Sequence, residues 1–185
     1  EVPLKFEFSN VPAGYDPAEL NASISPATIR IAGAADTVDG IESVNAGFIN
    51  LARVQLGKAE TLKIQLSEGL VNVDDVQEAT VTFDTSGYGE PRAITVSDIR
   101  VVNAPSGVDV KVITESINNV TLVGEAEELA AISPSDVIAQ VDASAQNITV
   151  KGSGQQQFSA QIIVTGTKTV IATGAYSVLC DITVK

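Results

Sequence analysis

The sequence predicts a mainly β protein made of two tandem small, strand-rich modules, each with one short helix after a central glycine. The first observation is composition: 44% of the 185 residues are hydrophobic but only 4% are aromatic, and there is no Trp. Val, Ile, Leu and Ala must therefore fill the core, and β-branched residues favour strands. The second observation is that apolar and polar residues alternate, with a period of two, along much of the chain. The third is a set of blocks that recur in the same order in both halves.

Strands are predicted wherever apolar and polar residues alternate, because successive side chains of a strand point to opposite faces. These segments are residues 4–8, 27–31, 61–66, 79–83, 93–102, 109–113, 119–123, 137–141, 157–165 and 178–184. Two segments differ, 34–41 and 125–132, where apolar residues lie three apart. Because that spacing suits one or two helical turns, we expect a short helix in each half.

The internal repeat is clearest in two blocks. Residues 6–14 match residues 99–107 at an offset of 93 (107 minus 14), with Asn, Pro and Gly coinciding, and residues 29–33 match residues 120–124. Weaker matches join 48–51 to 138–141, the alternating apolar positions of 61–66 to those of 157–165, and 79–83 to 179–184. Because several blocks recur in one order, two copies of one module explain the chain better than a single domain.

The boundary between the copies is predicted in a stretch with two Gly and one Pro, Thr85-Ser86-Gly87-Tyr88-Gly89-Glu90-Pro91-Arg92. Such composition is typical of a turn or short linker. We therefore divide the chain into module 1 (residues 1–86), a linker (87–92) and module 2 (93–185).

The glycines of the repeated blocks are expected to have structural roles. Gly33 and Gly124 each end a predicted strand just before the predicted helix. Glycine adopts positive φ at low cost, so we expect both to turn the chain from strand into helix. The Pro-x-Gly segments 12–14 and 105–107 are likewise predicted to be turns between adjacent strands.

The charge of the chain excludes some classes of partner. The net charge is −12, divided as −8 over residues 1–92 (6 basic, 14 acidic) and −4 over 93–185 (5 basic, 9 acidic). Proteins bind nucleic acids by neutralising phosphates with Lys and Arg, and polybasic patches dock on anionic lipids. We therefore expect no nucleic-acid partner and no direct lipid binding.

The chain has few of the residue types that catalytic sites use. There is no His and only one Cys, so His-based triads and multi-thiolate zinc sites cannot be built. The adjacent acidic pairs, Asp74-Asp75 and Glu127-Glu128, lack the spacing of a calcium loop and are predicted to be surface residues. Cys180 lies in an apolar stretch and is predicted to be a buried structural thiol. We expect no enzyme, cofactor, metal or small-molecule substrate, and assign no catalytic or binding residue.

The sequence also bears on membrane attachment. It contains no apolar run of about 18 residues, the length of a spanning helix. It begins at Glu1 without Met and without a basic-then-apolar leader. The expectation is a fragment whose signal or anchor lies upstream.

The order of the repeated elements resembles the YbbR-like domain of bacterial envelope proteins. In the second copy these elements are the Pro-x-Gly turn at 105–107, the strand ending at Gly124, the short helix, and a Val-Asp-Ala-Ser element at 141–144. The first copy departs at the last element, where Leu51-Ala52-Arg53 lacks the Asp. Any role of that carboxylate is therefore confined to Asp142.

The resemblance implies a β-rich module outside the cytoplasmic membrane, tethered by an N-terminal transmembrane helix that is not part of this chain. In some Firmicutes a YbbR-domain protein is thought to regulate a membrane-bound diadenylate cyclase. By that resemblance we expect a non-catalytic interaction or regulatory module whose partner is a membrane or envelope protein, with this cyclase as the named candidate. Two alternatives stay open: a structural spacer or adhesin stalk, and a carbohydrate-binding module that would use Tyr15, Tyr88 or Tyr176.

Overall fold

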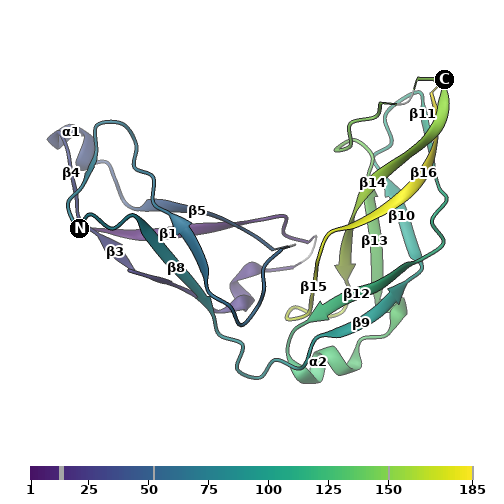
Figure 1. Ribbon diagram of the computed structural model, residues 1–185, viewed down its shortest axis with the longest axis horizontal. Coiled ribbons are helices and arrows are strands. Elements are labelled where there is room, and N and C mark those ends of the chain that lie inside the picture. Colours follow the sequence, from purple (N-terminus) through teal and green to yellow (C-terminus); the bar gives the residue numbers. More distant parts are fainter. Residues whose placement is uncertain (13–14, 52, 150, 185) are drawn as a thin grey trace. The chain divides into compact units, whose positions relative to one another are not determined.

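The computed structural model describes residues 1–12, 15–51, 53–149 and 151–184 (Figure 1). Strands dominate the described residues, with two short α-helices and two 3₁₀ turns. The predicted mainly β fold class is confirmed. The chain divides into two compact units: Glu1–Val11 with Pro17–Ser86, and Pro12–Asp16 with Gly87–Lys185.

The first unit is built of strands of two to eight residues. In chain order its elements are β1 (Val2–Ser9), η1 (Pro17–Leu20), β2 (Ala22–Ser25), β3 (Thr28–Ile29), β4 (Ile31–Ala32), α1 (Ala35–Val38), β5 (Val44–Asn50), β6 (Glu60–Lys63), β7 (Val71–Asn72) and β8 (Glu78–Phe83).

Strand β1 is the middle strand of one sheet of the first unit. It runs antiparallel to β3, with Val2 opposite Ile29, and parallel to β5, with Phe8 opposite Ile49. Strand β8 lies between β2 and β6, antiparallel to both, and β4 pairs with β7. The core is made of small and branched side chains, as the composition predicts: Val2, Leu4, Ile29, Ile31, Val44, Ala46 and Ala79.

The second unit has longer strands. Its elements are β9 (Arg92–Val96), β10 (Asp98–Val102), β11 (Val108–Val112), β12 (Ile117–Val123), α2 (Ala126–Ala131), η2 (Pro134–Asp136), β13 (Val137–Asp142), β14 (Ser153–Val164), β15 (Ile171–Thr173) and β16 (Tyr176–Val184).

Two sheets enclose the core of the second unit. A five-stranded sheet has the order β10-β13-β14-β16-β11, and a three-stranded sheet has the order β15-β12-β9. Val120 and Leu122 of the smaller sheet share one buried cluster with Val141, Phe158 and Ile182 of the larger. The core therefore lies between the sheets, and strand alternation places the apolar residues there.

The strand pairings of the two units largely correspond. The parallel pair β1–β5 ends with the Leu51 N–H donating to the Ser9 carbonyl (3.0 Å), and the parallel pair β10–β13 ends with the Ala143 N–H donating to the Val102 carbonyl (2.9 Å). The other pairs of the first unit also have counterparts in the second: β1–β3 corresponds to β9–β12, and β4–β7 to β12–β15. Likewise β2–β8 corresponds to β11–β16, and β6–β8 to β14–β16. One pairing has no counterpart in the described residues: β13 pairs with β14, whereas β5 does not pair with β6. Descent of both units from one module remains a prediction.

The predicted strands are found with different boundaries. The predicted strand 93–102 is two strands, β9 and β10, separated by Ser97, and 27–31 is interrupted at Arg30 between β3 and β4. The predicted 61–66 is shorter, because β6 ends at Lys63. Strands β2, β5, β7 and β15 were not predicted.

Both predicted helices are present and are short. Helix α1 is a single turn and α2 has six residues. Val38 and Ile41 pack against the first core, and Leu129 and Ile132 are buried in the second. The apolar spacing of three therefore marked the buried side of each helical segment.

The expectation that Gly33 and Gly124 take positive φ is wrong. Neither is among the residues with positive φ. Their requirement is close packing: a Cβ on Gly124 would lie 2.5 Å from the Thr169 carbonyl oxygen, and one on Gly33 would lie 2.9 Å from the Gly69 carbonyl oxygen. In each unit the strand before the helix passes so near a later backbone segment that a side chain has no room.

The first repeated block contains a shared backbone conformation. Asn10 and Asn103 both have φ of 53°, in the left-handed region that Asn tolerates better than most residues. In the second unit the predicted turn is confirmed, since the Val108 N–H donates to the Pro105 carbonyl (3.0 Å) and Gly107 has φ of 79°. The matching turn at 12–14 falls partly on residues 13–14, which lie outside the described residues.

The packing at Gly124 predicts that adding one methyl group at this position lowers the stability of the fold. Gly124→Ala should lower the free energy of unfolding by about 1–3 kcal/mol, because its Cβ meets backbone atoms that cannot rotate away. Gly33→Ala should act in the same direction. Gly40→Ala is the matched control, since a Cβ there meets nothing within 4 Å, and should change stability by less than about 0.5 kcal/mol. Urea denaturation measures all three, and equal stabilities would contradict the close-packing argument.

Candidate functional site

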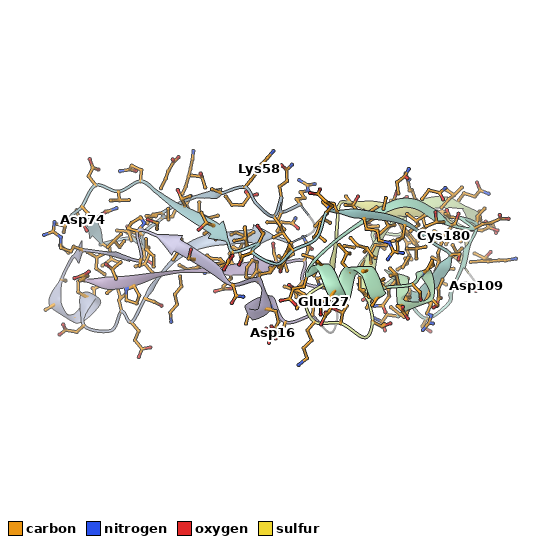
Figure 2. The ribbon with its side chains drawn as sticks, turned by 90° about the horizontal axis from the view of Figure 1, so that it is seen from below. Asp16, Lys58, Asp74, Asp109, Glu127 and Cys180 are labelled. Atoms are coloured by element: carbon orange, nitrogen blue, oxygen red, sulfur yellow. The ribbon has the colours of Figure 1, made fainter. Side chains whose placement is uncertain are left out.

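In the first predicted acidic pair, Asp75 is exposed, whereas Asp74 holds two segments of the fold together. Asp74 receives hydrogen bonds from the Arg30 backbone N–H (2.7 Å) and from Arg30 Nε (2.7 Å), and its Oδ1 lies 2.6 Å from an Arg30 terminal nitrogen. The hydrogen bond from the Arg30 side chain is the main reason that the pKa of Asp74 lies below its ordinary value. Asp74 therefore fastens the chain after β7 to the junction between β3 and β4, and Figure 2 shows its position.

In the second acidic pair, one residue is exposed and the other anchors a loop. Glu127 is exposed on α2 (Figure 2). The carboxylate of Glu128 accepts hydrogen bonds from the hydroxyls of Thr167 and Thr169, the latter at 2.8 Å. These bonds, that of Thr167 first, lower the pKa of Glu128. The loop that they hold is the one that packs on Gly124.

Asp142, the carboxylate of the Val-Asp-Ala-Ser element, is used within the fold. Its Oδ1 accepts hydrogen bonds from the Ser144 hydroxyl (2.7 Å) and backbone N–H (3.0 Å), and its Oδ2 accepts one from Asn103 Nδ2 (3.0 Å). The Ser144 and Asn103 side chains lower the pKa of Asp142. This carboxylate joins the ends of the parallel strands β10 and β13, so the Val-Asp-Ala-Ser element has a structural explanation in this chain.

Cys180 is buried, as predicted. It has 0% exposure in the second core, and burial raises the pKa of its thiol (Figure 2). A thiol in these surroundings is protonated at neutral pH and is a poor nucleophile.

Two features are absent from the part of the chain that the structure describes. Across residues 1–12, 15–51, 53–149 and 151–184, no three His, Cys, Asp or Glu side chains gather as metal ligands would. None of the helices described has the length and apolar character needed to cross a membrane.

The surface is hollowed between two edge strands of the first unit. A groove of about 180 Å³ is lined by residues at the end of β5, on the following loop and on β6: Phe48, Ile49, Asn50, Arg53, Val54, Glu60, Thr61 and Leu62. Phe48 has 62% of its surface exposed, an unusual state for a phenyl ring in a chain with five Phe. We take this groove, named the β5–β6 groove below, as the candidate site, because it places an exposed apolar group between the end strands of two sheets.

A β-bulge in β5 creates the groove's exposed ring. Lys5 pairs with Asn45, and Glu7 pairs with Phe48, so β5 has one extra residue at this point. Val44 and Ala46 are buried before the bulge, and Ile49 and Leu51 are buried after it. The buried positions change from even to odd numbers at Gly47. That shift is the sequence signal by which the strand and its bulge could have been found.

The comparison with protein families decides where the chain belongs. The family model described as YbbR-like protein matches residues 2–97, slightly more than half of the chain. The chain belongs to the YbbR-like protein family. The matched residues include the first unit, with the β5–β6 groove, and extend through β9 of the second unit.

A solved structure from the family shares some similarity with the chain. This YbbR-like protein from Streptococcus pneumoniae is 18% identical, and the alignment covers 100% of this chain and 91% of that chain with a TM-score of 0.32. Those values are too low to support an argument about fold or function. No curated protein matches the chain.

The hydrogen bonds to Glu128 predict a defined pH dependence. Because the pKa of Glu128 in the folded chain is below its ordinary value of 4.5, the unfolded state binds the proton more tightly. Its contribution to stability is therefore present above pH 4.5 and is lost as the pH falls through the folded-state pKa. Glu128→Gln should lower stability at pH 7, and the difference from wild type should shrink towards pH 3.

Urea denaturation at a series of pH values measures this difference. Glu127→Gln makes the same change of net charge at an exposed position of the same helix and is the matched control. If the two variants lose the same stability at each pH, the hydrogen bonds from Thr167 and Thr169 do not stabilise the fold.

Proposed function

We propose that this chain is a non-catalytic interaction segment of a membrane-anchored bacterial envelope protein, and that it acts outside the cytoplasmic membrane. Its partner is a membrane or envelope protein, and the diadenylate cyclase implied by the resemblance to YbbR-like proteins is the specific candidate. In this role the segment regulates the partner by binding it.

Membership of the YbbR-like family is the observation that carries this proposal. The β5–β6 groove supports it, because an exposed Phe beside a surface groove is typical of a surface that binds another protein. The carboxylates with the clearest partners support it as well. Asp74, Glu128 and Asp142 are each occupied by hydrogen bonds that fasten one segment of the fold to another.

The charge of the chain supports a protein partner over a nucleic acid. A net charge of −12 repels a phosphate backbone, and the chain would approach anionic lipid at an electrostatic cost. Recognition of a specific membrane protein avoids both conflicts.

Direct measurement of cyclase activity tests the proposal. The purified chain, added to vesicles in which the diadenylate cyclase exposes its extracytoplasmic face, should bind the vesicles and change the rate of cyclic dinucleotide synthesis. Allosteric coupling of ordinary size changes such a rate by about 5-fold or more. The readouts are co-sedimentation and product formation under identical conditions.

Vesicles without the cyclase, and an unrelated acidic protein in place of the chain, are the controls. Binding that requires the cyclase but leaves its rate unchanged would support a spacer or scaffold and contradict regulation. Absence of cyclase-dependent binding would overturn the named partner. Capture of glycans by the chain would favour the carbohydrate-binding alternative, for which the half-buried Tyr15, Tyr88 and Tyr176 are the available tyrosines.

A further inference from the structure

We propose that Asp39-Gly40, directly after helix α1, is a site of spontaneous backbone modification, at which Asp39 cyclises to a succinimide and reopens as isoaspartate. The reaction needs no enzyme and no co-reactant other than water. The proposal goes beyond the proposed function and does not depend on it.

The dipeptide occurs once in the chain. Of the 14 Gly, Gly40 alone follows an Asp or an Asn. Glycine has no Cβ, so its backbone nitrogen is poorly shielded and its backbone rotates readily. The nitrogen and the carboxyl group that it attacks belong to neighbouring residues, and such an intramolecular reaction is strongly favoured over its bimolecular equivalent.

The reaction releases one water and then consumes one. The Gly40 backbone nitrogen attacks Cγ of the protonated Asp39 carboxyl group; the N–Cγ bond forms, the Cγ–OH bond breaks, and the hydroxyl leaves as water with the amide proton. A second water adds to the main-chain carbonyl carbon of Asp39 and breaks its bond to the Gly40 nitrogen. The main chain then runs through Cβ and Cγ of residue 39, and the former main-chain carbonyl becomes a carboxylate.

The reacting groups are accessible in the structure. Asp39 and Gly40 are both exposed, and a Cβ on Gly40 would meet nothing within 4 Å. The neighbouring amides are engaged: the Asp39 N–H donates to the Ala35 carbonyl (2.9 Å) and the Ile41 N–H to the Val38 carbonyl (3.1 Å). Over the described ranges of the chain, no hydrogen bond holds the Gly40 N–H.

Cyclisation also requires Asp39 to leave its present backbone conformation. Its φ of −62° and ψ of −21° are helical, whereas a five-membered ring needs Cβ, Cα, C and the next nitrogen nearly coplanar. Helix α1 is a single turn, none of its residues is buried, and Ala34 provides no side-chain cap. A helix this short gains little from its own hydrogen bonds, so its end opens at low cost in free energy.

Asp36 is an internal control within the same helix. It is exposed, as Asp39 is. The residue after it is Thr37, whose N–H donates to the Ala34 carbonyl (3.0 Å) and whose side chain is branched at Cβ. Exposure alone would make both aspartates react, whereas the geometry described above selects Asp39.

The modification has a consequence for packing. Val38 and Ile41, on either side of the dipeptide, both pack against the core of the first unit. Isoaspartate inserts one extra backbone carbon between these two contacts, in the crossover that joins β1 to β5. The altered chain cannot keep both side chains in their present positions without strain, so we expect the modified protein to be less stable.

Timed incubation of the purified chain at neutral pH tests the proposal. Trypsin cleaves after Arg30 and Arg53, so one peptide, 31–53, contains both Asp36 and Asp39. Electron-transfer fragmentation distinguishes isoaspartate from aspartate at each position. Isoaspartate should accumulate at residue 39 and not at residue 36, with a transient species lighter by one water.

Two variants assign the chemistry to the dipeptide. Gly40→Ala should slow the reaction by about tenfold, because the added Cβ hinders attack, and the open space around it leaves the fold intact. Asp39→Glu keeps the charge but forms a six-membered ring much more slowly, and should remain unmodified. Asp36→Glu is the matched control and should react like wild type. In urea denaturation, aged wild type should unfold at lower urea than fresh protein, and aged Asp39→Glu should not.

The isolated peptide 31–53, incubated in parallel, measures the reaction without the fold. If the peptide reacts and the folded chain does not, the fold protects Asp39 and the proposal is wrong. Equal modification of Asp36 and Asp39, or an unchanged rate in Gly40→Ala, would also overturn it. An unchanged urea midpoint in fully modified protein would contradict the consequence for packing.

Discussion

In each unit a parallel pair of strands, β1–β5 in the first and β10–β13 in the second, is the constraint on which the rest of the fold depends. Parallel neighbours require a crossover connection, because a tight turn cannot bring them side by side. In the first unit the crossover from β1 to β5 contains β2, β3, β4 and α1, and in the second unit the crossover from β10 to β13 contains β11, β12 and α2. The strand before the helix has to pass close to a later segment, and Gly33 and Gly124 make that approach sterically possible.

In the second unit, polar contacts also hold helix α2 in place. Arg92 Nη1 donates to the carbonyls of Leu129 (3.1 Å) and Ile132 (2.8 Å) at the end of α2, where a cation and a donor are both favourable. Glu128 holds the facing loop from the same helix. The charged residues that a search for catalysis would consider first are therefore engaged in joining elements that lie far apart in the sequence.

Strand alternation and the repeated blocks carried most of the information about the fold that could be obtained from the sequence. They predicted the buried faces of the long strands and of both helices, since burial on one face imposes a period of two or of three to four. They missed β7 and β15, because strands of two or three residues are too short to show a period. They also misassigned Gly33 and Gly124, because close packing depends on a segment that lies tens of residues later. The groove was not predicted either, because its two sides belong to different sheets.

The chain after β6 differs from its counterpart in the second unit. Alternation continues to Leu66, and on this basis a strand to residue 66 was predicted, but β6 ends at Lys63 and the next apolar residues, Ile64 and Leu66, pack against the first core. The corresponding strand of the second unit, β14, is twelve residues long and remains beside β13. In the first unit core packing therefore continues after β6 ends, without the edge pairing that β14 makes in the second unit. The bulge at Gly47 interrupts the regular ladder of β5, a device by which sheets limit pairing with other chains.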